Sequence, residues 1–252
     1  MGTGTSVGVP QIGCTCPTCL STDPRDKRRR TGLYVAGERA RFVVDTPPEF
    51  REACLALGIS RVDAVVVTHA HMDHVAGFDD IRRFNTLNGG APMRCYAAAE
   101  TIDSLHGIFP YITDRANEQG LFRPMINFVP VEAEFSIGDV RLTPLPVEHG
   151  PRTNGYLVES GGRRAAYISD CHSIPPSTLE MMRGVDVLVL DCLRERFHPT
   201  HLNREASLAY VADIRPGRTF FVHMCHDVMH ATFEETLPPD VKLAYDGLVV
   251  DV

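Results

Sequence analysis

Short runs of apolar residues recur along the 252-residue chain, and several have the length and β-branched content of buried strands. We expect strands over residues 41–45, 64–68, 141–145, 165–169, 185–190 and 219–222. The pair Gly161 and Gly162 predicts a hairpin turn between a strand at 155–159 and the strand that begins at Ala165. No apolar run reaches the roughly 20 residues that a membrane-spanning helix needs.

Helical signals lie between these runs. Thr46 is the expected N-cap of a helix, with Pro47 at its first position, Glu49 in a capping box and Gly58 after its end. Further helices are expected over residues 75–85, 176–183, 204–214 and 232–237. Strands mixed with helices in this way predict an α/β layered protein.

The stretch 106–128 has no clear periodicity and contains Gly107, Pro110, Gly120 and Pro124. We therefore expect a long loop or partial lid there. No linker, low-complexity tract or repeat interrupts the sequence, so we expect one domain over residues 1–252.

The net charge bears on which partners the protein binds, and the amino terminus bears on its location. A net charge of -7 and a pI of about 5.9 disfavour long nucleic acid, because phosphate neutralisation by basic residues supplies most of that affinity. The basic run at 26–30 is interpreted as a solvated loop, with a phosphate-steering patch as the alternative. The amino terminus lacks the basic start and apolar block of a secretory signal, so a cytoplasmic protein is expected.

Histidine and aspartate residues gather where apolar runs end. Strand ends that meet at one edge of a sheet place such side chains around one crevice, and burying them without partners is costly. A metal site gives them partners. The residues concerned are Asp45, His69, His149, Asp170, Asp191 and His223.

The densest group of potential ligands has four within six positions, in the string Thr68-His69-Ala70-His71-Met72-Asp73-His74. On a tight loop that leads into a helix, these ligands can split into two adjacent groups, as two neighbouring cations require. The string resembles the His-x-His-x-Asp-His motif of the metallo-β-lactamase superfamily. That resemblance implies a four-layer αββα sandwich with a dinuclear metal site at one edge of its two sheets.

The resemblance also implies two sets of metal ligands and a carboxylate between them. The first set is His69, His71 and His149, the second is Asp73, His74 and His223, and Asp170 bridges both. Imidazole and carboxylate ligands suit Zn²⁺, Mn²⁺ or iron, and the sequence does not select among them. Asp45 is either a hydrogen-bond partner of a ligand imidazole or the cap of the following helix.

Three cysteines near the amino terminus, Cys14, Cys16 and Cys19, follow the pattern C-x-C-x-x-C. Their thiolates leave one position of a tetrahedral zinc open, and His226 is the expected fourth ligand of this structural Zn²⁺ within a Cys-rich loop at 1–30. A reduced loop without metal is the alternative. The remaining cysteines lie in apolar segments and are interpreted as buried reduced thiols.

This combination resembles the phosphodiesterase family of the bacterial carbon–phosphorus lyase (phosphonate) pathway, over nearly the whole chain. Members of that family combine a structural zinc with a dinuclear centre. They carry a complete strand before the Gly-Thr-Gly at residues 2–4, whereas only Met1 precedes it here. Either the start is placed late or the first strand is missing, and in both cases we expect a weaker sheet edge and unchanged metal ligands.

The segment 191–203 resembles the part of these enzymes that brings a histidine to the substrate. His201 is preferred as the proton donor to a leaving alkoxide, and His198 is the second choice. With Asp73, His201 makes up the expected catalytic pair. His172 follows the bridging aspartate and is interpreted as a hydrogen-bonded bystander.

These expectations describe a dinuclear phosphodiesterase. Two divalent ions, Mn²⁺ or Zn²⁺, are expected to lower the pKa of a shared water so that a bridging hydroxide attacks phosphorus. The resemblance implies a cyclic phosphate or nucleotide as substrate, a nucleoside monophosphate as product, and a homodimer. The alternatives are a ribonuclease of the tRNA 3′-processing type, a thioester or lactam hydrolase, and a non-catalytic metal- or nucleotide-binding protein of the same fold.

Overall fold

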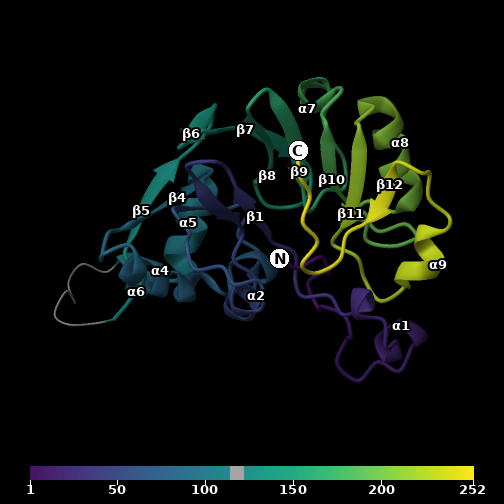
Figure 1. Cartoon of the computed structure of the whole chain (residues 1–252), viewed down its shortest axis with the longest axis horizontal. Helices are drawn as coiled ribbons and strands as arrows, with labels where there is room; N and C mark the ends of the chain where they lie inside the picture. Colours follow the sequence, from purple (N-terminus) through teal and green to yellow (C-terminus); the bar gives the residue numbers. More distant parts are fainter. Residues whose placement is uncertain (114–121) are drawn as a thin grey trace.

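The computed structural model describes residues 1–113 and 122–252, which form two β-sheets packed face to face (Figure 1). The first sheet has the order β1-β2-β3-β4-β5, with strands Leu33–Ala36, Arg41–Val44, Ala64–Val66, Met93–Ala97 and Ile126–Pro130. The second sheet has the order β12-β11-β10-β9-β8-β7-β6. From β6 to β12 its strands are Phe135–Ile137, Val140–Val147, Thr153–Ser160, Arg163–Ile168, Val187–Asp191, Arg218–Val222 and Val241–Leu243.

Three apolar clusters divide the fold into layers. Phe42 of β2 and Tyr156 of β8 are buried together between the sheets, whereas Val43, the next residue of β2, is buried in the cluster on the outer face of the first sheet. This alternation follows from the two-residue period of a strand. Helices complete both outer layers, so the fold is the expected αββα sandwich.

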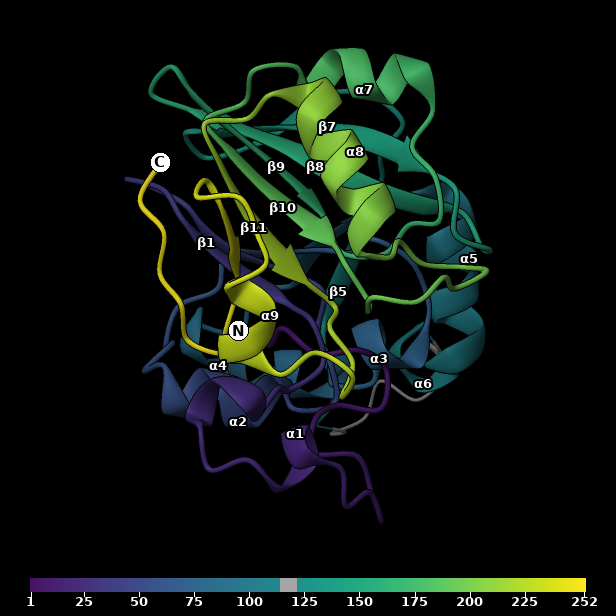
Figure 2. The same cartoon turned by 90° about the vertical axis from the view of Figure 1, so that its right-hand side faces the viewer.

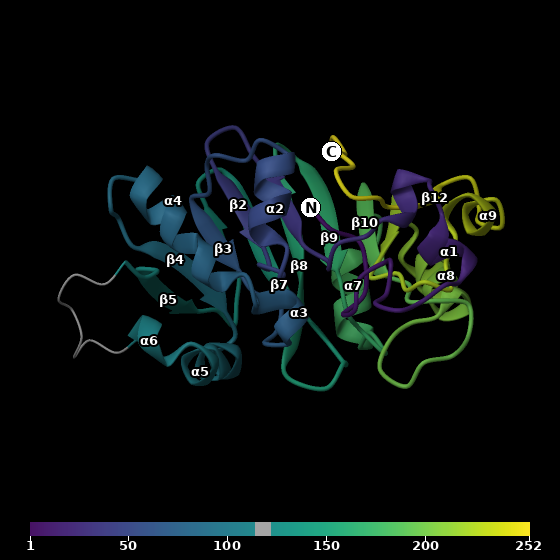
Figure 3. The same ribbon diagram turned by 90° about the horizontal axis from the view of Figure 1, so that it is seen from below.

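The outer helices belong to separate parts of the chain. Figure 3 shows α2, α4 and α5 on the first sheet, and Figure 2 shows α7 and α8 on the second. Their bounds are Phe50–Ala56, Ile81–Leu87, Ala99–Ile108, Pro176–Met182 and Arg204–Ile214, and α9, at His230–Glu234, also packs on the second sheet. No helix in the described part of the chain is long and apolar enough to cross a bilayer.

Parallel pairing brings several strand ends to one edge of the sandwich. The pairs from β2 to β5 are parallel, and so are those from β9 to β12. Parallel strands present their carboxyl ends on the same side, where ligands bind in open α/β sheets. The residues at these ends or within three positions after them include Asp45, His69, Asp170, Asp191 and His223.

The strand predictions are confirmed. Each expected strand overlaps an observed one, and the glycines of the predicted hairpin, Gly161 and Gly162, have positive φ angles of 57° and 80° between β8 and β9. The helices expected at 176–183 and 204–214 are also confirmed, as α7 and α8.

The capping box predicted at Thr46 is wrong. The helix begins at Phe50, and its N-cap Glu49 makes no side-chain capping bond because its carboxylate pairs with Arg30. Thr46 is buried, and its backbone N–H donates to the carbonyl of His74 at 2.8 Å. The predicted end is confirmed, because Gly58 follows the helix at a φ of 65°.

The helix predicted over 75–85 is broken into α3 (Met72–Val75), a 3₁₀ turn (Phe78–Asp80) and α4. The break lies at Gly77, where an added Cβ would come within 2.3 Å of the carbonyl oxygen of Pro47. The helix predicted at 232–237 is displaced, since α9 ends at Glu234.

The loop predicted at 106–128 is wrong over most of the residues that the structure describes. The helix α5 continues to Ile108, α6 occupies Pro110–Thr113, and β5 begins at Ile126. Residues 114–121 lie outside the described part of the chain.

The solvated basic loop predicted at 26–30 is also wrong. Asp26 and Arg28 are buried, and they form an ion pair of 3.2 Å. Arg29 lies 3.6 Å from Asp246, and Arg30 pairs with Glu49. Most of the run is therefore paired with acidic residues. It begins at the last residue of the short 3₁₀ helix Pro24–Asp26, which follows α1 (Pro17–Leu20) in the chain.

Candidate metal centres

Three histidines form the first group of potential ligands. His69 and His71 lie between β3 and α3, and His149 follows β7. The Nε2 atom of His69 lies 2.9 Å from Nδ1 of His71, and Nε2 of His149 lies 3.2 Å from the same nitrogen. The three candidate ligand atoms lie within 4.8 Å of one another, so they converge on a space that one cation can occupy.

Asp73, His74, Asp170 and His223 form the second group. The Nε2 atom of His74 lies 3.4 Å from Oδ2 of Asp73 and 3.1 Å from Oδ1 of Asp170. Nδ1 of His223 lies 3.3 Å from the same oxygen of Asp170. His71 is the N-cap residue of α3, so the transition from loop to helix separates the motif into two groups, as expected.

Asp170 lies between the two groups. While its Oδ1 faces His74 and His223, its Oδ2 lies 3.7 Å from Nε2 of His149 in the first group. The side chain is almost fully buried. Its position is therefore that of a carboxylate shared by two adjacent sites.

The hydrogen bonding of these groups fits metal ions. Among the described residues, Nε2 of His74, Oδ1 of Asp170 and Nδ1 of His223 are buried without a hydrogen-bond partner. Buried polar atoms nearly always have partners, so three convergent exceptions require an explanation. Nitrogen and carboxylate oxygen are ligands of divalent transition metals, and one cation satisfies all three atoms.

The protonation of the histidines also fits metal ions. Burial holds the pKa of His69 well below its usual value and lowers that of His223 to about 3, so both imidazoles are in the neutral form that binds metals. Burial opposes a charge on His74, but the carboxylates of Asp170 and Asp45 outweigh it and raise the pKa of His74 well above its usual value. These carboxylates attract positive charge to this position, whether a proton or a metal ion.

Asp45 orients two of the proposed ligands. Its Oδ2 accepts a hydrogen bond from Nδ1 of His74 at 2.7 Å and another from the Thr68 hydroxyl at 2.8 Å. That hydroxyl lies 2.9 Å from Nδ1 of His69. Asp45 has a φ of 66°, a left-handed conformation that is rare outside glycine and common at functional sites. Of its two predicted roles, the structure favours the hydrogen-bond partner over the helix cap.

His201 lies beside both groups. Its ring centroid is 4.8 Å from that of His149 and 4.7 Å from that of His223. Its Nδ1 lies 2.9 Å from Oδ2 of the buried Asp191 and 3.9 Å from Oδ2 of Asp170. Burial disfavours a charge on His201, but the hydrogen bond and charge of Asp191 outweigh burial and raise its pKa.

The two other histidines near this segment differ from His201. Nδ1 of His198 accepts a hydrogen bond from the backbone of Thr200 at 3.3 Å, and its ring lies 5.2 Å from that of His201. His172 is exposed, and its backbone N–H donates to the carbonyl of Glu148 at 2.7 Å. Neither belongs to the candidate ligand groups found among the described residues.

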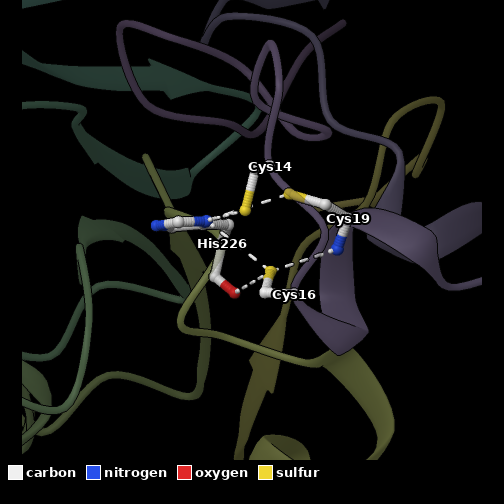
Figure 4. Close-up of side chains that lie close together, drawn as sticks. All are labelled: Cys14, Cys16, Cys19 and His226. Carbon is white, nitrogen blue, oxygen red and sulfur yellow. Dashed lines mark hydrogen bonds between the residues drawn. The ribbon is translucent and has the colours of Figure 1, made fainter.

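The third candidate centre contains the cysteines predicted from the sequence. Figure 4 shows Cys14, Cys16 and Cys19 around the ring of His226. The distances from their sulfur atoms to Nδ1 of His226 are 3.1, 3.6 and 3.8 Å, in that order. Tetrahedral zinc, with bonds of about 2.3 Å to sulfur and about 2.0 Å to nitrogen, separates such atoms by about 3.5 Å. The geometry therefore fits Zn²⁺.

The surroundings of this loop favour a thiolate. The backbone N–H of Cys19 donates to Sγ of Cys16 at 3.4 Å and lowers the pKa of Cys16 to about 7. Burial raises the pKa of Cys19 to about 11, so this thiol ionises readily only beside a cation. The remaining cysteines are buried and free, as predicted.

Comparison with known proteins places the chain in a family. The family model of the β-lactamase superfamily domain matches residues 40–224, which include all seven proposed dinuclear ligands. The chain belongs to the metallo-β-lactamase superfamily. The fold and the clusters of histidine and aspartate agree with this assignment, and they identify a metal-dependent hydrolase.

Two solved structures of the superfamily are similar over almost the whole chain. A diphosphatase from the PhnP family is 38% identical with a TM-score of 0.89, covering 98% of this chain and 93% of its own. Zn²⁺-bound PqqB from Methylobacterium extorquens is 22% identical with a TM-score of 0.79, covering 100% and 98%. At that identity PqqB supports the fold alone, whereas the diphosphatase supports the resemblance to the phosphonate-pathway phosphodiesterases.

A curated relative has a different name. The octanoyltransferase of Porphyromonas gingivalis is 32% identical over 98% of this chain. The chain spans only 50% of the length of that relative.

Two contacts near the superfamily's metal centre were missed by the sequence reasoning. Asp191 was noted only as a residue after a strand, although its position at the end of β10, ten residues before His201, was the available signal. The carbonyl oxygen of Thr200 lies 2.9 Å from Nδ1 of His149. A backbone carbonyl has no side-chain signature, so no sequence signal could have identified it.

Proposed function

We propose that this hydrolase cleaves small phosphodiesters, such as cyclic phosphates or nucleotides, with a nucleoside monophosphate as a product. The observation that carries the proposal is the position of Asp170 between two groups of ligands, with His201 beside both and close enough to His149 and Asp170 to form a further group of candidate ligands. We assign His201 the role of proton donor, because its Nδ1 is already paired with Asp191. Paired cations and a nearby proton donor are the arrangement that in-line displacement at phosphorus requires. The identity with a diphosphatase further supports a phosphoryl substrate.

The proposed ligands of the two metals follow the two groups in the structure. His69, His71 and His149 hold the first, Asp73, His74 and His223 hold the second, and Asp170 is shared. When bound, two divalent ions such as Zn²⁺ or Mn²⁺ would supply a Lewis acid for the phosphoryl oxygens and a water of lowered pKa. A separate structural Zn²⁺ is proposed at Cys14, Cys16, Cys19 and His226.

His201 is the proposed proton donor. Because its Nδ1–H donates to Asp191, Nε2 is the atom left to protonate the departing oxygen. Asp191 holds the ring in one orientation and also accepts the backbone N–H of Cys171 at 3.0 Å. Asp73 is the second proposed catalytic residue. Burial opposes its charge, but His74 holds the pKa of Asp73 well below its usual range, so its carboxylate remains available to accept a hydrogen bond from the attacking water.

A phosphodiester and a diphosphate make different demands on His201. An alkoxide leaving group must gain a proton, whereas a phosphate or a p-nitrophenolate departs without one. Dependence on His201 therefore distinguishes the proposed phosphodiesterase from a diphosphatase acting at the same centre.

The ribonuclease alternative has less support. Recognition of long RNA depends on exposed basic residues that contact phosphates. In the described structure, the basic run is partnered: Arg28 is buried with Asp26, and Arg30 pairs with Glu49. The small-substrate proposal does not require such a surface.

The test compares hydrolysis of three substrates by the metal-loaded protein: a 2′,3′-cyclic nucleotide, bis(p-nitrophenyl) phosphate and a dinucleoside diphosphate. We expect metal-dependent turnover of the first two. His201→Ala should slow the cyclic nucleotide about 10²-fold and the aryl diester far less. His172→Ala is the matched control, because that histidine is exposed and outside the ligand groups. Metal-loaded protein that hydrolyses neither diester would refute the proposal.

A homodimer is proposed from the family resemblance. Light scattering of the purified protein gives the mass directly, and a mass of one chain at micromolar concentration would refute the dimer.

A further inference from the structure

The segment from residue 223 to residue 226, here called the metal strap, contributes to two candidate centres at once. His223 belongs to the second group of the dinuclear centre, and His226, three residues later, faces the three cysteines. The inference that follows rests on the proposed metal sites. We propose that the buried Arg28 is a positioning residue for the metal strap, and that it ties the affinity of the second metal site to the integrity of the cysteine site.

The backbone of the metal strap needs external support. His223 has a φ of 60°, a strained conformation for a non-glycine residue that persists only where the surroundings enforce it. The N–H of Met224 donates to the carbonyl of Thr3 at 3.1 Å, and Thr5 donates back to Met224 at 3.2 Å. On the other flank, the N–H of Cys225 donates to the carbonyl of Leu193 at 3.0 Å. The strap is thus held between the amino-terminal segment and the loop that leads to His201.

Among the residues of the basic run, Arg28 is the one whose side chain donates a hydrogen bond to a backbone carbonyl of the metal strap in the described structure. Its Nη1 donates to the carbonyl of Cys225 at 3.2 Å, and its Nη2 lies 3.2 Å from Oδ1 of Asp26. The same oxygen of Asp26 accepts the backbone N–H of His230 at 2.8 Å. Arg28 therefore connects Asp26 to Cys225, a residue that lies between the two histidines of the candidate metal sites.

The burial of the Arg28–Asp26 pair indicates that it holds neighbouring groups in position. The Arg28 side chain is fully buried, and its Nε has no hydrogen-bond partner in the described structure. A buried ion pair is weak evidence for added stability, because desolvation offsets the attraction. A guanidinium offers donors in a fixed planar fork, so it can hold a carbonyl and a carboxylate at defined positions. In this protein those two partners lie on the two segments that converge at the cysteine site.

Loss of Arg28 should affect the second metal site and the cysteine site but not the first group of ligands. Without the Arg28 guanidinium, Cys225 and its neighbours lose one fixed contact, and His223 and His226 are displaced together. The first group of ligands, His69, His71 and His149, contains no residue of the strap, so its affinity should be unchanged. Loss of a residue that orients a metal ligand lowers affinity by about 10- to 100-fold, and we expect about 10-fold here because Arg28 acts through the backbone.

The test measures metal binding of full-length Arg28→Met, Arg28→Lys and wild-type protein. Equilibrium dialysis against a Mn²⁺ series, with elemental analysis, gives the affinity and stoichiometry of the dinuclear sites. Loading with Co²⁺ reports the cysteine site, because thiolate ligands give it a charge-transfer absorption that nitrogen and oxygen ligands lack. We expect Arg28→Met to weaken one Mn²⁺ site about 10-fold and to change the Co²⁺ spectrum, and Arg28→Lys to restore part of both.

A destabilised core variant is the control. Leu105→Ala removes a fully buried side chain of α5, in the cluster on the outer face of the first sheet and away from the metal strap. It should lower the melting temperature while leaving both metal readouts at wild-type values. Unchanged Mn²⁺ affinity in Arg28→Met, or an equal loss in Leu105→Ala, would overturn the proposal.

A second pair of variants covers failure to fold. If Arg28→Met does not fold, Arg28→Lys and Asp26→Asn carry the same comparison, because the first keeps both charges but loses the planar fork, and the second keeps the fork but loses the negative charge. These readouts need no substrate. A protein that binds Mn²⁺ but hydrolyses no phosphodiester would refute the proposed function and leave this inference testable.

Discussion

The proposed dinuclear centre and the proposed cysteine centre are built in different ways. The ligands of the first are mostly buried and follow strand ends in both sheets, whereas three of the four ligands of the second come from six consecutive positions of one partly exposed loop. The first is therefore assembled by the whole fold, and the second by local sequence plus one distant histidine. Damage to the first should affect chemistry more than stability, and damage to the second should do the reverse.

The largest expected effect is that of His71→Ala on hydrolysis. His71 is exposed, so its removal leaves the core intact but takes away a proposed ligand. Because the metals provide several kcal/mol of transition-state stabilisation, turnover should fall by about 10³-fold or more. Steady-state kinetics and circular dichroism measure the two quantities, and wild-type turnover would mean that His71 is no ligand.

A smaller loss of activity is expected for Asp191→Asn. The amide keeps the shape but not the charge that orients His201, so kcat should fall by about 10- to 100-fold with KM and metal content unchanged. A fall in metal content would instead assign Asp191 to the support of the metals. Kinetics and elemental analysis on one preparation distinguish these outcomes.

For Cys16→Ser we expect a larger effect on stability than on hydrolysis. Zinc should fall by one ion per chain and the melting temperature by about 5–10 °C, because a structural zinc contributes directly to folding. Metal at the first group, His69, His71 and His149, should remain. Full zinc retention with an unchanged melting temperature would show that the cysteine loop does not hold zinc.

The smallest effect is expected for Glu49→Gln. The Arg30–Glu49 pair is partly exposed, and such pairs contribute less than about 1 kcal/mol to the free energy of unfolding. Urea denaturation measures the change. If Glu49→Gln lowered the free energy of unfolding as much as Arg28→Lys does, the exposed ion pair of the basic run would stabilise the fold as much as the buried one.

Much of the fold was predictable because its central strands carry continuous apolar runs. Strands such as β2 and β3 are buried on both faces, and the sequence marks them clearly. The strand β1 was missed because its residues are only half buried, and β5, at the other edge of the first sheet, has the same mixed pattern. An edge strand packs against one neighbour only, so its apolar signal is weak. The strand β4 is central and was also missed, because the exposed Arg94 interrupts its apolar run.

The candidate ligands were predictable for a similar reason, and their supports were not. The string from His69 to His74 is local, and its neighbours at strand ends are marked by the runs before them. Glu49 has the spacing of a capping box, but Arg30, nineteen positions earlier, competes for its carboxylate. Arg28 has the sequence context of a surface cation, and only the approach of Cys225 in the folded chain explains its burial.

The split origin of the dinuclear ligands has a consequence for the lifetime of the protein. Because the groups around Asp170 are drawn from both sheets, an unfolded chain cannot assemble them, and bound ions stabilise the folded state alone. At a free metal concentration 100 times the dissociation constant, one such site adds about 2.7 kcal/mol to the stability of the folded state. Metal starvation would thus enlarge the population open to proteases, and the abundance of the enzyme would follow the metal supply before its catalysis did.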